Sequence, residues 1–260
     1  MTYDPFIYLY KSVFLQRITD YVRSGHVHWT SGEVSLARAG ALAKKFDRLY
    51  GVGRSRHQRA WARIKGEASA VLLFYRRPGR SSDSPLPSPD GAEQTPAEVR
   101  PSADAAEPKL VWMLLVTEGE HLAPRLERLH HAPDPSGRVR VDELELVALP
   151  RPGQSRPAWT WRMAEDAVQG WRATLIDCAR RQPWRLGHEV QQLARLPGFA
   201  GCRAQVKKLM QLAWGEHRRR LPGEPALACP RQPYLARLPD TGVRLSALMR
   251  AQPSIASALR

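Results

Sequence analysis

The feature that most constrains this chain is a pair of short apolar runs separated by a long polar segment. Residues 67–77 (EASAVLLFYRR) and 109–117 (KLVWMLLVT) carry β-branched and aromatic side chains, which is typical of buried strands. The intervening residues 78–108 are rich in Pro, Ser, Asp and Glu, so we expect a flexible loop there. The two runs are expected to pair as a hairpin across that loop, and a linker between domains is the alternative.

Periodic patterns on both sides of this hairpin predict an α+β domain. Strand patterns occupy residues 6–14 and 138–149, and helical patterns occupy residues 16–23, 33–50, 55–65 and 120–131. The resulting order is strand, helices, strand, strand, helix, strand. It predicts a ferredoxin-like or RRM-like β-α-β-β-α-β domain over residues 1–150, with an Arg-rich helical finger inserted at about 31–66.

Residues 151–260 are expected to form a second lobe, either mostly helical or a degenerate ferredoxin-like fold. The patterns predict a Trp-rich strand at 158–163, helices at 164–181 and 184–196, a glycine turn, and a basic helix at 202–220. The proline-rich residues after 224 contain one possible short strand, at 234–238.

Positive charge is concentrated in both lobes. The 260 residues include 40 Lys+Arg and 25 Asp+Glu, for a net charge of +15. Residues 1–80 carry a net +10 and residues 151–260 a net +12, whereas residues 81–108 carry −5. Because neutralising phosphates releases condensed counterions, such lobes favour a polyanionic partner. Charge alone does not distinguish RNA, DNA and a membrane surface.

Several other classes of protein are disfavoured. The apolar runs are too short to cross a bilayer, and the first residues lack the pattern of a signal peptide. Three scattered cysteines predict neither a disulfide framework nor a zinc site. The sequence contains no P-loop, nucleophile elbow or dinucleotide-binding fingerprint. We therefore expect a cytoplasmic protein with no metal, no small-molecule cofactor and no membrane association.

Basic side chains gather on the two helices predicted between residues 31 and 66. They are Lys45 and Arg48 on the first helix, and Arg54, Arg56, Arg59, Arg63 and Lys65 on and around the second. Glu33 and Asp47 are the only carboxylates in this stretch. Unneutralised positive charge suggests an absent anionic partner, and a basic helix suits an RNA stem or a DNA groove. A merely solvated charged face is the alternative.

A candidate catalytic group lies between the first strand and these helices. It comprises Arg23, His26, His28 and Arg38. When the 2′-hydroxyl of RNA attacks the adjacent phosphate, histidine suits the proton transfers and arginine suits the charge of the phosphorane. We expect these residues to converge, with no need for a metal. The alternative is a loop with surface histidines.

A glycine turn before the basic helix at 202–220 is a second candidate phosphate site. Gly198 and Gly201 precede Arg203, Lys207 and Lys208, and a helix N-terminus offers backbone N–H groups to phosphate. A plain turn between two helices is an equally acceptable interpretation.

Taken together, these features resemble the CRISPR-RNA repeat-processing endoribonucleases of the RAMP superfamily, in particular the version found in plasmid-borne type IV systems. The likeness rests on the opening unit from Phe6, the group Arg23, His26, His28 and Arg38, the Arg-rich finger at 54–65, and Gly198 with Gly201. It implies metal-independent cleavage of precursor crRNA next to the repeat hairpin by 2′-hydroxyl attack. It also implies retention of the mature crRNA in a complex with other CRISPR effector subunits. The alternative is a non-enzymatic nucleic-acid-binding protein of a plasmid or integrating element, serving replication, partition or conjugation.

Overall fold

The computed structural model describes residues 3–77, 109–151 and 153–251 of an α+β protein. Its contacts divide the chain into two units, the first comprising residues 1–129 and 238–260 and the second residues 130–237. The sequence suggested one boundary near residue 150, whereas the contacts place the first boundary after Leu129 and return the chain to the first unit at Leu238. The expected loop at 78–108 lies outside the described residues.

A mixed six-stranded sheet organises the first unit. Its strands are β1 (Phe6–Tyr8), β2 (His28–Ser35), β3 (Ala70–Arg76), β4 (Lys109–Val116), β5 (His130–His131) and β9 (Gly242–Arg244). Their order is β5-β2-β4-β3-β1-β9. β3 and β4 form the expected antiparallel hairpin, β2 is antiparallel to β4, and β1 is parallel to β3 and antiparallel to β9. The two-residue β5 is where the chain passes from the first unit to the second.

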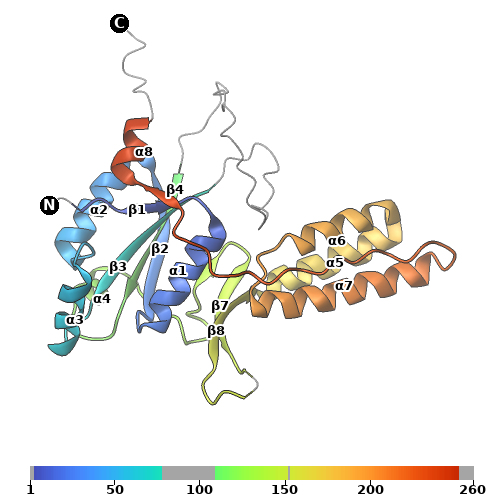
Figure 1. The fold of residues 1–260 in the computed structure, drawn as a ribbon, viewed down its shortest axis with the longest axis horizontal. Helices are drawn as coiled ribbons and strands as arrows, with labels where there is room; N and C mark the ends of the chain where they lie inside the picture. The colour runs from blue at the N-terminus through green and yellow to red at the C-terminus, as the bar shows by residue number, and fades with distance from the viewer. Residues whose placement is uncertain (1–2, 78–108, 152, 252–260) are drawn as a thin grey trace, which may run out of the picture. The chain divides into compact units, whose positions relative to one another are not determined.

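Helices cover both faces of this sheet (Figure 1). They are α1 (Lys11–Arg23), α2 (Leu36–Tyr50), α3 (Arg56–Ile64), α4 (Ala123–Leu126) and α8 (Leu245–Ala251). One core joins α2, α4 and α8 to alternate residues of the strands, among them Leu72 and Phe74 of β3. On the opposite face, the ring of Phe14 in α1 stacks on Tyr75 of β3 with centroids 5.3 Å apart. Burial on both faces explains why β3 and β4 are continuous apolar runs.

Two elements near the N-terminus differ from the sequence prediction. The strand expected at 6–14 ends at Tyr8, and α1 begins at Lys11. Phe14, Ile18 and Val22 are buried at the i, i+4 spacing of a helix. The predicted helix at 33–50 begins only at Leu36, because the preceding residues form β2. The first unit therefore contains a strand, β2, that the sequence pattern did not indicate.

Three later segments also differ. The helix expected at 120–131 is reduced to α4, whose N-terminal turn contains Pro124. The strand expected at 138–149 is two strands that turn at Asp142, whose φ of 53° is left-handed. No strand forms at 234–238; β9 follows a few residues later, where it pairs with β1.

The second unit combines a small antiparallel sheet with helices. Its elements are β6 (Arg140–Val141), β7 (Leu144–Leu149), β8 (Ala158–Met163), α5 (Glu165–Arg181), the 3-10 turn η1 (Pro183–Arg185), α6 (Leu186–Ala194) and α7 (Ala200–Arg220). The sheet order is β6-β7-β8, and α7 packs against both α5 and β8. The strand, the two helices and the basic helix predicted here are thus confirmed within a few residues. Across the part of the chain that is described, no helix has the length and apolarity required to traverse a membrane.

Candidate functional site

The Arg-rich helix α3 is held at its ends and exposes most of its surface. Ser55 and Gln58 form a capping box, in which the Ser55 hydroxyl accepts from the Gln58 backbone and the Gln58 side chain accepts from the Ser55 backbone. Ala62 is the one residue of α3 that is buried, and Trp61 is 64% exposed. Near the other end, the guanidinium of Arg63 donates to the carbonyl oxygen of Ser24 at 3.2 Å. The sequence thus builds a helix whose side chains are available to a partner.

Beside α3 lies a pocket of about 210 Å³, which we call the arginine–tyrosine pocket. It exists because β1 is short: β1 pairs with β3 at Phe74 and Tyr75, and the preceding part of β3 lines the pocket. The aromatic and basic side chains that line it come from distant parts of the sequence. They are Tyr3, Tyr8 and Tyr21 together with Arg54, Arg59 and Arg244.

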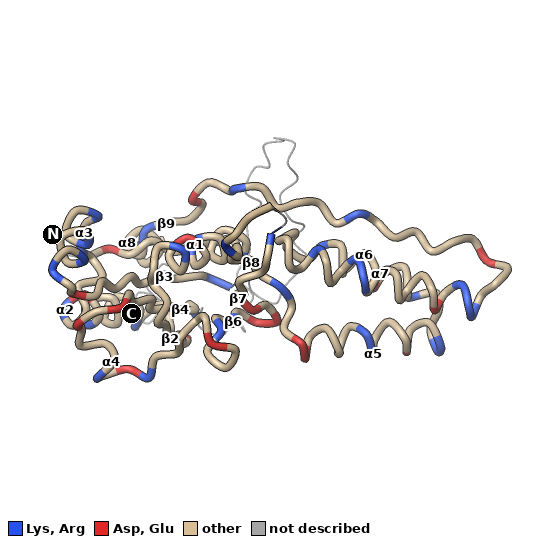
Figure 2. Tube along the Cα trace, turned by 90° about the horizontal axis from the view of Figure 1, so that it is seen from below, with Lys and Arg blue, Asp and Glu red and all other residues tan. Residues whose placement is uncertain are grey.

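Few carboxylates neutralise the arginines of this surface, whose helix is marked in Figure 2. Arg54 forms an ion pair with Glu67 at 3.5 Å, and both side chains are roughly half exposed. Arg244 donates to the backbone oxygen of Asp4. Among the residues that the structure describes, Arg56 and Arg59 have no carboxylate partner within ion-pair distance. This surface therefore carries unneutralised guanidinium groups in the fold as well as in the sequence.

The three tyrosines of the pocket remain neutral hydrogen-bonding groups. Burial raises the pKa of Tyr3, Tyr8 and Tyr21 above the ordinary value of 10. The hydroxyl of Tyr3 donates to the carbonyl oxygen of Leu72 at 3.3 Å. A set of guanidiniums and phenols around one hollow is suited to a phosphate or to the edge of a sugar or base.

His26, a predicted catalytic residue, is enclosed by the protein. It is 4% exposed, and its ring nitrogens face hydroxyl groups, with Nδ1 3.1 Å from Ser24 Oγ and Nε2 3.3 Å from Ser69 Oγ. Burial, with a smaller contribution from the positive charges of Arg59 and Arg63, lowers the pKa of His26 from 6.5 to about 4. The ring is therefore a neutral, hydrogen-bonded part of the core beneath α3.

The other predicted catalytic residues do not gather around it. Arg23 is exposed at the last position of α1, whereas Arg38 is exposed in the first turn of α2. Between them runs the eight-residue strand β2, which spans about 26 Å at 3.3 Å per residue. Because Arg23 and Arg38 lie beyond opposite ends of that strand, the expected convergence is not found.

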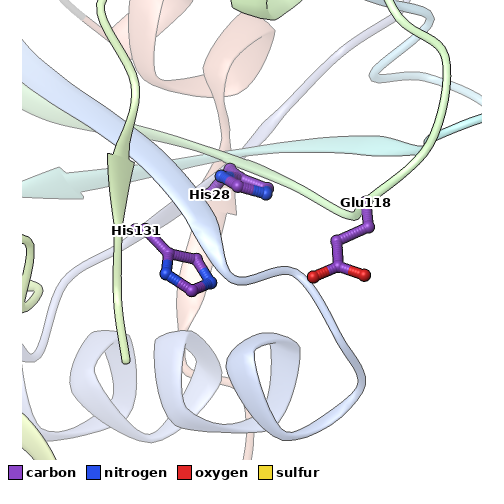
Figure 3. Close-up of side chains that lie close together, drawn as sticks. All are labelled: His28, Glu118 and His131. Atoms are coloured by element: carbon purple, nitrogen blue, oxygen red, sulfur yellow. The ribbon is translucent and has the colours of Figure 1, made fainter. Parts of the chain in front are cut away.

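His28 begins β2, and Glu118 follows β4, the antiparallel neighbour of β2 (Figure 3). A ring nitrogen of His28 and a carboxylate oxygen of Glu118 lie within 4.8 Å of each other. Two donors are fewer than the protein ligands of a zinc site. His131, drawn in the same view, is assigned to the second unit, so the described residues of the first unit offer two donors here.

The predicted basic residues of α2 do not line the arginine–tyrosine pocket. Lys45 and Arg48 are exposed, and the ammonium of Lys45 lies 5.7 Å from the ring centre of Phe46. Lys65, just after α3, is exposed as well. The pocket therefore unites only part of the basic set that the sequence suggested, namely Arg54 and Arg59.

The glycine turn of the second unit serves close backbone packing. A Cβ on Gly198 would overlap the carbonyl oxygen of Pro233, and one on Gly201 would lie 2.6 Å from that of Trp161. The backbone N–H of Gly201 donates to the hydroxyl of Thr160 at 3.3 Å. This N–H at the start of α7 is therefore already engaged within the protein.

Sequence reasoning missed the tyrosines of the pocket and Arg244. Tyr3 and Arg244 lie near opposite ends of the chain, and no spacing rule connects them. No protein-family model matches this chain, and neither a curated protein nor a solved structure proved similar to it.

Proposed function

We propose that the first unit binds the backbone of a structured nucleic acid on the surface formed by α3 and the arginine–tyrosine pocket. The observation that carries the proposal is the meeting of Arg54, Arg59 and Arg244 with three tyrosines around one hollow. Guanidinium groups bind phosphate through paired hydrogen bonds. The exposed Trp61 on the same helix offers a ring on which a base can stack.

The resemblance to the CRISPR-RNA repeat-processing endoribonucleases gives this proposal a specific ligand and reaction. The ligand is then the repeat hairpin of a precursor crRNA, with α3 against the stem and a backbone phosphate in the pocket. The protein cleaves the RNA beside the hairpin without a metal. Arg23 and the pocket arginines stabilise the phosphorane that forms during cleavage. The product then stays bound among other effector subunits. Along the sheet, β9 pairs antiparallel with β1, β1 pairs parallel with β3, and β3 pairs antiparallel with β4. This pattern of pairing supports a rearranged ferredoxin-like sheet.

A labelled repeat hairpin, incubated with the purified protein in EDTA, tests this form. We expect cleavage that disappears when the nucleotide at the cut carries a 2′-deoxy sugar. Arg59→Ala should weaken binding and cleavage together, whereas Arg172→Ala, which removes an exposed arginine of α5, should change neither. RNA that is bound but left intact would remove the enzymatic part of the proposal and leave the binding part.

A second candidate function is sequence-independent binding of DNA without catalysis, as in a protein of a mobile element. The burial of His26 and the separation of Arg23 from Arg38 favour it, because they leave these residues without a shared proton-transfer site. Competition between duplex DNA and hairpin RNA for the same labelled complex decides between the two. Displacement by DNA at equal or lower concentration would favour this second function.

A further inference from the structure

The second unit contains a larger pocket that the proposed function does not use. It has a volume of about 560 Å³ and lies between α7 and the segment that follows it. Its lining residues are Arg203, Val206, Lys207, Met210, Gln211 and Trp214 of α7, with Cys229, Pro230, Arg231 and Gln232 from the segment. That volume falls within the range of small-molecule sites.

The segment is held against α7 and against the turn that precedes it by contacts at several points. The side-chain amide of Gln232 donates to the Leu196 carbonyl oxygen at 2.6 Å, and the backbone N–H of Leu235 donates to Gly198. The guanidinium of Arg203 lies 5.9 Å from the ring centre of Tyr234. The segment therefore runs back along α7, as Figure 1 also shows, and encloses the pocket on one side.

The chemistry of the lining is cationic at its polar positions and apolar elsewhere. Arg203, Lys207 and Arg231 contribute three positive charges, and none of the lining residues is a carboxylate. Val206, Met210 and Trp214 lie at the i, i+4, i+8 spacing that forms one stripe of a helix. A matching ligand joins an anionic group to a flat apolar body.

A buried hydrogen-bond acceptor further restricts the chemical class of ligand that fits this pocket. Gln232 is 6% exposed, and its Oε1 has no hydrogen-bond partner in the described part of the protein. The donation of its amide nitrogen to Leu196 fixes which end of the side chain is the oxygen. Protein atoms cover this oxygen, so a ligand donor reaches it when the Gln232 side chain turns toward the pocket. A buried acceptor is stabilised by such a donor, which a fatty acid does not provide and an amino-bearing base does.

We propose that this pocket binds one nucleotide, with the phosphate at Arg203, Lys207 and Arg231, the base against Met210 and Trp214, and a base amino group at Gln232 Oε1. The nucleotide is either a free mononucleotide or an unstacked nucleotide of a strand, since both present the same chemistry. The proposal does not depend on the function proposed for the first unit, because a mononucleotide reaches this pocket without α3.

Titration calorimetry of the full-length protein with AMP, and with inorganic phosphate as a second probe, tests the site. We expect saturable binding of AMP that phosphate alone does not reproduce. Lys207→Gln should weaken it about fivefold, the effect of about 1 kcal/mol for one charge-assisted contact. The adjacent Lys208→Gln is the matched control, because Lys208 is exposed on α7 and does not line the pocket.

A second comparison addresses Gln232. Purine riboside monophosphate, which lacks the amino group, should bind about fivefold more weakly than AMP, and Gln232→Met should abolish that difference. A short oligoadenylate that binds more tightly than AMP, and that loses affinity in Lys207→Gln, assigns the site to a strand; otherwise it belongs to free nucleotide. Absence of AMP binding, equal effects of Lys207→Gln and Lys208→Gln, or full competition by phosphate would each overturn the proposal.

Discussion

Two groups of arginines in this protein have opposite electrostatic surroundings. On α3, Arg56 and Arg59 have no carboxylate partner within the described residues, and both extend from a helix with a single buried residue. In the small sheet, Glu145 of β7 is 8% exposed and accepts hydrogen bonds from Arg138 at 3.2 Å and Arg162 at 2.7 Å.

The difference shows that a basic composition is not by itself a binding surface. Arg162 stands opposite Glu145 in the strand register, so its charge is used within the fold. The arginines of α3 contribute little to packing, so their charge remains available for a ligand. The predictions below test this contrast.

The largest effect is expected from Glu145→Gln. The substitution leaves the guanidiniums of Arg138 and Arg162 without their shared carboxylate and should lower the free energy of unfolding by about 3 kcal/mol. Urea denaturation measures it. Asp166→Asn, which breaks the exposed pair with Arg140, should change stability far less, and an equal loss in the two variants would contradict the contrast.

His26 should make the stability of the first unit depend on pH. Its pKa is about 4 in the folded protein and about 6.5 in the unfolded chain. The contribution of neutral His26 to the free energy of unfolding is therefore fully present above pH 6.5 and declines as the pH falls toward 4. The expected loss between pH 7 and pH 5 is about 2 kcal/mol.

His26→Gln should remove that part of the pH dependence in urea denaturation at the two pH values. His57→Gln replaces an exposed histidine of α3 and should retain the wild-type difference. If His26→Gln keeps the full difference, the imidazole is not held neutral by the fold.

Arg59→Ala should reduce affinity for a structured RNA about tenfold and lower the slope of log affinity against log salt by about one. Its effect on unfolding should be small, within about 0.5 kcal/mol for a residue that few contacts hold. Arg162→Ala should show the reverse pattern, a loss of stability with unchanged affinity. Filter binding across a salt series, together with urea denaturation, measures both quantities.

The smallest expected effect is an increase in RNA affinity. Glu67→Gln removes the partner of Arg54 and should increase RNA affinity about twofold at low salt, because an exposed ion pair is worth only a few tenths of a kcal/mol. Glu33→Gln, which removes the carboxylate that pairs with Arg77 instead, should leave affinity unchanged. A decrease in affinity for Glu67→Gln would show that Arg54 needs its carboxylate in order to be positioned.

The predictable elements share strong local patterns. The strands β3 and β4 are continuous apolar runs, and the capping box of α3 is formed by Ser55 and Gln58, which lie close together in the sequence. The strand β2 has no such pattern, because its sequence HWTSGEVS is polar at most positions. Its pairing depends on β4 and on Gly32, where a Cβ would lie 2.8 Å from the side chain of Trp112. Contacts of that kind are invisible in the local sequence.

The sequence by itself determined where charge accumulates and where the hairpin, the capped helix and the basic helix form, since those properties depend on neighbours along the chain. Only the tertiary structure decided which charges are neutralised. It buried His26, placed Arg38 beyond the far end of β2, and brought Tyr3 and Arg244 from opposite ends of the chain to one pocket. The physical reason is that burial and Coulomb interactions depend on distance in space, which strand pairing sets and sequence separation does not.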